Sequence, residues 1–159
     1  GVLVKANHCI LKPLWPDEFD LPDVEIDEAH GEHVIGEEVE YAIMNAAREH
    51  GVQVTEFTIA PRIQVSGELP YHEWFVEFGT MPADIAAFAT TVNNHLRGKN
   101  IYYEDLMSGG ILQPLKIRVM KKNTFIEYMR SIGKLGGQNK VPRLGNDRKI
   151  ADALQPWIA

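Results

Sequence analysis

The sequence predicts an α+β domain in which a small sheet of about three strands is covered by helices. Three segments alternate apolar and polar residues with the period of a strand, and others repeat apolar residues with the period of a helix. Glycines and prolines separate these segments, as they do between the elements of compact domains. With 159 residues, 45% of them hydrophobic, the chain can form one hydrophobic core.

The first predicted elements are a helix and two strands. Residues 37–50 place apolar or small side chains on one helical face, begin with acids that suit the helix dipole, and are followed by Gly51. Residues 53–60 alternate as a strand does, and Pro61 is expected to end that strand. Alternation resumes over 73–78, which predicts a second strand antiparallel to the first.

The remaining predicted elements are a helix over 82–96, a short helix over 100–108, a strand over 115–119, a helix over 124–132 and a short helix in the last ten residues. Thr124 and Glu127 have the spacing of a capping box at the start of the predicted helix over 124–132. Tyr102 and Tyr103 are consecutive, so a helix points them in different directions, and one is expected in the core with the other half exposed. No RNA-binding signature surrounds them.

The chain divides into an irregular acidic lead-in or hinge remnant, residues 1–30, and an α+β domain, residues 31–159. A single cysteine, Cys9, excludes an internal disulfide and favours a reducing, cytoplasmic compartment. No apolar run approaches the roughly 20 residues of a membrane span. His30 and His33 have a spacing that one helix face could use for a metal, but no further ligand cluster lies nearby, so no metal site is expected.

Charge is distributed unevenly along the chain, whose net charge is −6. Residues 1–96 carry a net charge of −13, whereas residues 97–149 carry +8. A positive second half favours an anionic partner such as a nucleotide, a nucleic acid or an acidic protein face. The negative net charge argues against broad affinity for nucleic acid.

The segment 133–149 combines four glycines with five basic residues. Glycines let backbone amides approach a ligand, and lysine or arginine side chains bind anions. Three basic residues, Lys140, Arg143 and Lys149, follow the glycines, and a loop lysine can neutralise charge that develops on a phosphate. The spacing is not that of a Walker A loop. A solvated basic loop without a ligand is the simpler alternative.

Several segments, in order, resemble the auxin-responsive Gretchen Hagen family of acyl acid–amido synthetases. They are the stretch Gly31–Glu40, Trp74-Phe75-Val76, the tyrosine-pair segment Ile101–Leu106, the segment Leu112-Gln113-Pro114-Leu115-Lys116-Ile117, and Gly133-Lys134 followed by Gln138-Asn139-Lys140-Val141-Pro142-Arg143. The resemblance covers roughly residues 31–155 and is closest to a bacterial branch. It departs from the family in residues 1–30, which lack the usual Gly-Arg-Thr-like hinge.

The family belongs to the adenylate-forming superfamily, so the resemblance implies a ligase that uses ATP with Mg to convert a carboxylic acid into an acyl-adenylate and then joins it to an amino acid. The chain would be the small mobile C-terminal domain, whose partner is a large N-terminal nucleotide-binding domain absent from it. The domain alone is expected to be inactive and to bind no cofactor.

The resemblance also implies site residues. Lys149 lies just past the Pro142-Arg143 step and corresponds to the adenylation lysine, with Lys140 as the rival assignment because the spacing is about one residue longer than in the superfamily. Arg143 is expected to pair with a carboxylate that fixes the loop. The implied nucleotide and phosphate loop comprises Gly136, Gly137, Gln138, Lys140 and Arg143. The alternative function is a stand-alone binding or regulatory module with a basic face for an anionic partner.

Overall fold

The computed structural model describes residues 34–63, 67–134, 136 and 140–159. Its elements are α1 (Gly36–His50), β1 (Gln53–Arg62), β2 (Tyr71–Thr80), α2 (Ile85–Lys99), α3 (Ile101–Ser108), β3 (Lys116–Val119), α4 (Thr124–Ser131), α5 (Lys149–Leu154) and the 3₁₀ helix η4 (Gln155–Trp157). The strands form one sheet of order β1-β2-β3, in which β2 is antiparallel to β1 and parallel to β3. The predicted α+β class and the antiparallel pair are therefore confirmed.

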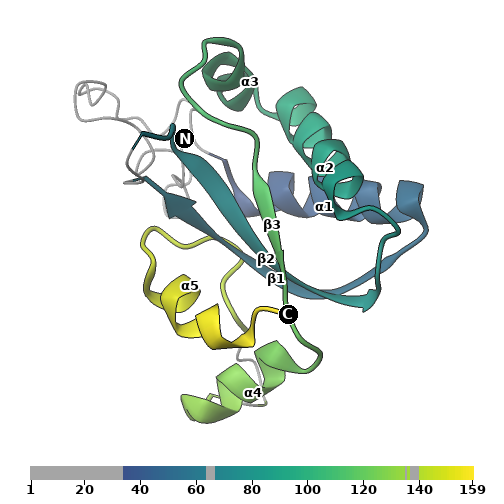
Figure 1. Cartoon of the computed structure of the whole chain (residues 1–159), viewed down its shortest axis with the longest axis vertical. Helices are drawn as coiled ribbons and strands as arrows, with labels where there is room; N and C mark the ends of the chain where they lie inside the picture. The colour runs from purple at the N-terminus through teal and green to yellow at the C-terminus, as the bar shows by residue number, and fades with distance from the viewer. Residues whose placement is uncertain (1–33, 64–66, 135, 137–139) are drawn as a thin grey trace.

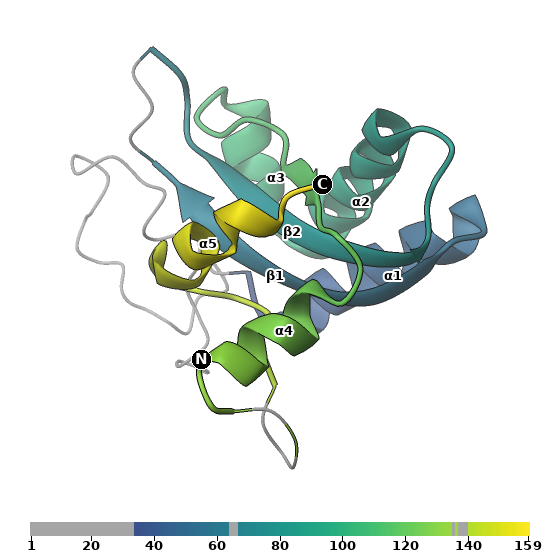
Figure 2. The same cartoon turned by 60° about the horizontal axis from the view of Figure 1, so that its bottom comes forward.

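Helices cover both faces of this sheet. Helices α1, α2 and α3 lie on one face, and α4 and α5 lie on the other (Figures 1 and 2). Each side has its own hydrophobic cluster, the larger one between the sheet and α1 to α3 and the smaller one beneath α4 and α5. The sheet is thus the middle layer of three.

The central strand β2 is buried along both of its faces from Tyr71 to Phe78. Trp74 and Val76 belong to the larger cluster, whereas Phe75 belongs to the smaller one. Its alternating sequence predicted one polar face, but α4 and α5 cover that face. Two of its acids, Glu73 and Glu77, are consequently buried.

Several element boundaries differ from the predicted ones, and two of these differences have a clear local cause. Strand β1 continues through Pro61 instead of ending there, because Pro61 has the same orientation as Ile59, whose N–H and C=O point away from β2. Helix α2 begins at Ile85 rather than near residue 82, because the side chain of Asp84 accepts a hydrogen bond from the N–H of Ala87 at 3.1 Å.

The tyrosine pair divides as expected. Tyr103 is fully buried and its hydroxyl donates to the side-chain oxygen of Asn93 at 2.5 Å, whereas Tyr102 is 37% exposed. Burial raises the pKa of Tyr103, so this hydroxyl stays protonated and keeps donating.

The predicted capping box at the start of α4 is wrong. The hydroxyl of Thr124 donates to the carbonyl oxygen of Lys121, and Glu127 pairs instead with Arg130. The cap comes from the sheet, because the carboxylate of Glu77 accepts from the N–H of Asn123 at 2.7 Å and from the N–H of Phe125 at 3.2 Å. A carboxylate at a helix start satisfies donors that the helix itself leaves unpaired.

Replacing Glu77 with alanine is expected to lower the free energy of unfolding by about 2 kcal/mol, because the variant removes the acceptor of the buried N–H of Phe125 and of the partly buried N–H of Asn123. Urea unfolding of the 159-residue chain followed by circular dichroism measures this loss. Glu127→Ala is the matched control, since this half-exposed acid should contribute less than about 1 kcal/mol. A larger loss for Glu127→Ala than for Glu77→Ala would favour the predicted capping box over the cap from Glu77.

Candidate functional site

The 140–149 segment, which contains the predicted lysines, runs along the free edge of β1. The hydroxyl of Thr58 donates to the carbonyl oxygen of Pro142 at 2.6 Å. The N–H of Ile59 donates to the backbone carbonyl oxygen of Arg143, and the N–H of Gly145 donates to the carbonyl oxygen of Ile59, both at 2.9 Å. The segment therefore continues the sheet by a short parallel pairing and has a defined backbone position.

Arg143 fastens this segment to α1 and β1. Its Nε donates to Glu40 at 2.7 Å, its Nη1 pairs with Glu56, and its guanidinium lies 4.5 Å from the ring centre of Phe57. Burial alone lowers the pKa of Arg143, but the hydrogen bonds to the two carboxylates outweigh it and raise the pKa. The expected pairing with a carboxylate is confirmed, and this guanidinium is already occupied within the domain.

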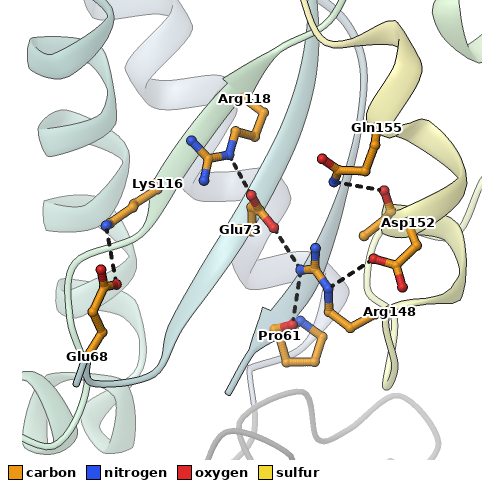
Figure 3. Close-up of polar contacts among 9 residues, drawn as sticks. Pro61, Glu68, Glu73, Lys116, Arg118, Arg148, Asp152 and Gln155 are labelled. Carbon is orange, nitrogen blue, oxygen red and sulfur yellow. Dashed lines mark hydrogen bonds and ion pairs between the residues drawn. The ribbon is translucent and has the colours of Figure 1, made fainter. Parts of the chain in front are cut away.

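A second arginine, Arg148, fastens the other end of the segment (Figure 3). Its Nη1 donates to Glu73 at 2.7 Å and to the carbonyl oxygen of Pro61 at 3.2 Å. Its Nε lies 3.6 Å from a carboxylate oxygen of Asp152. Glu73 also accepts from Arg118 on β3, so this carboxylate joins the central strand, an edge strand and α5.

The Glu73 side chain is only 3% exposed. Burial raises the pKa of Glu73, but hydrogen bonds from Arg118 and Arg148 more than offset that effect and hold the pKa below its ordinary value. Glu73 is therefore ionised at neutral pH and retains both arginines. Neither Glu73 nor Arg148 was predicted as a site residue; the available signal was an acid within a strand, flanked by aromatic residues.

Lys149 is the first residue of α5 and follows Arg148 directly. Its N–H donates to the carboxylate of Asp147 at 3.0 Å, which fixes its backbone. Its side chain is exposed, and its ammonium group makes no ion pair with any residue that the structure describes. An unpaired ammonium group held at a defined surface position can bind an anion brought to it.

Lys140, the rival lysine, lies in different surroundings. It is exposed, and with Lys134 and Gly136 it lines a hollow of about 230 Å³ between β1 and α4. Gly136 has a φ of 93°, in the left-handed region that glycine adopts readily. Gly137 and Gln138, the other residues assigned to the loop, lie outside the described residues.

The uneven charge along the sequence does not describe the charges of the folded domain, because the arginines of the basic half form ion pairs. Each of the five arginines in 97–149 pairs with a carboxylate: Arg97 with Glu104, Arg118 with Glu73, Arg130 with Glu127, Arg143 with Glu40 and Glu56, and Arg148 with Glu73 and Asp152. Several of these partners come from the acidic first half. The charges of Arg118, Arg143 and Arg148 are thus offset by acids of the first half.

Other features bear on cofactors and membranes. Among the described residues, no group of three or more histidine, cysteine or acidic side chains could hold a metal ion. His30 and His33 lie outside the described residues. None of the helices in the described ranges is both long and apolar enough to cross a membrane.

Residues 37–149 match the family model of the GH3 family C-terminal domain. The chain therefore belongs to the GH3 family and contains its C-terminal domain, as the motifs indicated. A search of curated proteins finds no match.

Solved structures share the fold. A structure described as GH3.15 acyl acid amido synthetase aligns with a TM-score of 0.63 and 19% identity over 80% of this chain and 23% of its own. Another, AtGH3.15 acyl acid amido synthetase in complex with 2,4-DB, aligns with a TM-score of 0.62 and 19% identity over 86% and 25%. The chain thus spans about a quarter of the length of these structures.

Proposed function

We propose that this chain is the mobile C-terminal domain of an ATP-dependent acyl acid–amido synthetase, which adenylates a carboxylic acid and conjugates it to an amino acid. The family match over residues 37–149 carries this proposal, because it includes every element from α1 to the first residue of α5. The fold shared with the two longer solved structures of GH3.15 acyl acid amido synthetase supports a large N-terminal domain as the partner.

In the first half-reaction, a carboxylate oxygen of the acid attacks the α-phosphorus of ATP and pyrophosphate leaves. Negative charge on the phosphate oxygens grows in that step, so a nearby cation accelerates it. Lys149 is the residue we assign to this role, because its ammonium group is exposed while Arg143 and Arg148 hold its segment. The amine of the amino acid then attacks the acyl carbon and AMP leaves, after the domain has rotated to form the amine site.

Other parts of the proposal rest on the sequence. Lys140 and Gly136, with Gly137 and Gln138, are proposed to contact the nucleotide, and Mg is proposed to arrive with ATP rather than to be held by this domain. The lone Cys9 supports a cytoplasmic location, and the motifs favour the bacterial branch of the family.

The isolated chain is expected to catalyse no adenylation, because the pockets for ATP and the acid belong to the proposed N-terminal domain. ATP–pyrophosphate exchange with a panel of aromatic and aliphatic carboxylic acids tests this expectation. The full-length protein is the positive control and should exchange with at least one acid. Exchange by the isolated chain at the full-length rate would contradict the domain assignment.

A further inference from the structure

Two adjacent residues of the 140–149 segment, Arg148 and Lys149, have different surroundings. Lys149 is exposed to solvent. The side chain of Arg148 instead reaches the buried carboxylate of Glu73 on the central strand (Figure 3). Because Arg148 and Lys149 share a peptide bond, whatever fixes Arg148 also fixes the backbone that carries the lysine.

The contacts of Arg148 come from three elements. Its Nη1 bonds Glu73 on β2 at 2.7 Å and the carbonyl oxygen of Pro61 on β1 at 3.2 Å. Its Nε faces Asp152, which lies one helical turn later on α5, at 3.6 Å. These contacts connect the start of α5 to two strands and to the next turn of the same helix. A planar guanidinium, with several N–H donors in fixed directions, suits such a set of acceptors.

Stability alone does not account for this arrangement. A buried ion pair recovers its desolvation cost only when its geometry is good, and apolar residues often serve stability equally well. What a charged pair adds is direction, since it requires one orientation of the arginine. In this chain that orientation fixes the backbone position from which the side chain of the next residue, Lys149, extends.

We propose that Glu73 and Arg148 are positioning residues for Lys149: they hold the start of α5 so that the ammonium group reaches the phosphate during adenylation. This inference rests on the proposed function. The role is not assigned to Arg118, which donates to the same carboxylate from β3 but does not belong to the 140–149 segment that carries the lysine.

Arg148→Gln and Arg118→Gln form a matched pair, because each removes one guanidinium from Glu73. In the full-length protein, Arg148→Gln is expected to slow ATP–pyrophosphate exchange about tenfold or more, since small misplacements of a reacting group are costly. Amide formation from preformed acyl-adenylate should change less than about twofold. Arg118→Gln should leave both half-reactions within about twofold, and Arg148→Lys should recover part of the lost exchange rate.

A double variant separates positioning from a general loss of structure. In a Lys149→Ala background, Arg148→Gln is expected to slow exchange no further, because no ammonium group remains to be positioned. If Arg148→Gln does not fold, as judged by circular dichroism, Arg148→Lys replaces it in the same comparison. Equal effects of the Arg148 and Arg118 variants, or additive losses in the double variant, would overturn the inference.

The same experiment distinguishes this failure from failure of the proposed function. If the wild-type protein exchanges with no acid, or Lys149→Ala exchanges normally, then the proposed function or its lysine is wrong and the inference falls with it. If both behave as expected and the arginine variants are indistinguishable, only the positioning role is wrong.

Discussion

Lys149→Ala in the full-length protein is expected to slow adenylation by about 10²–10³-fold, the loss typical of removing one group that stabilises charge in a transition state. Amide formation from preformed acyl-adenylate should be nearly unchanged, because the phosphate charge that the lysine stabilises develops only in the preceding adenylation step. The expectation follows from the exposed ammonium group at the start of α5, which has no ion-pair partner within the described part of the chain.

ATP–pyrophosphate exchange measures the first half-reaction, and single-turnover amide formation from supplied acyl-adenylate measures the second. Lys140→Ala is the matched control, because this lysine is also exposed and follows the same glycines. Its smaller effect would support Lys149, whereas the reverse order would assign the adenylation role to Lys140. Equal losses in both half-reactions for Lys149→Ala would contradict a role specific to adenylation.

The stability of the domain is expected to fall steeply as the pH drops below 6.5, because of His72. This residue is fully buried in the face of β2 that α3 covers, and its ring stacks on Tyr103 with 5.5 Å between ring centres. Neither ring nitrogen has a hydrogen-bond partner among the described residues. Burial lowers the pKa of His72 from 6.5 to about 3.

The sign follows from the protons bound by each state. Between about pH 3 and pH 6.5 the unfolded chain carries a protonated His72, whereas the native protein keeps the imidazole neutral. The unfolded state binds more protons there, so the contribution of His72 to the free energy of unfolding is intact above pH 6.5. Below it, that contribution falls by about 1.4 kcal/mol for each pH unit.

Urea unfolding at several values between pH 7 and pH 5 measures the slope. His72→Phe retains an aromatic ring against Tyr103 and is expected to remove this part of the slope, with stability at pH 7 at least equal to that of the wild type. His95→Phe, which replaces a partly exposed histidine beside Glu49, should keep the His72 slope. An unchanged slope in His72→Phe would contradict the assignment.

The wrong capping box and the unidentified partners of Arg143 have a common cause. Local sequence supports Thr124 and Glu127 as a capping box, yet Glu77, 46 residues from Asn123, supplies the cap. Likewise Arg143 meets Glu40 across 103 positions. A periodic pattern reports which side chains are buried, but it contains no information about which distant carboxylate a buried donor will meet.

Local periodicity, turn residues and residue identity were enough to predict the order and type of the elements, the antiparallel pair, the split between Tyr102 and Tyr103, and the motifs of the family. The parallel direction of β3, the second buried face of β2 and the arginine partners of Glu73 became apparent only in the folded structure. The second buried face and these ion pairs arise when α4 and α5 pack on the sheet, since covering that face removes Glu73 from water and leaves two arginines as the partners that keep it charged.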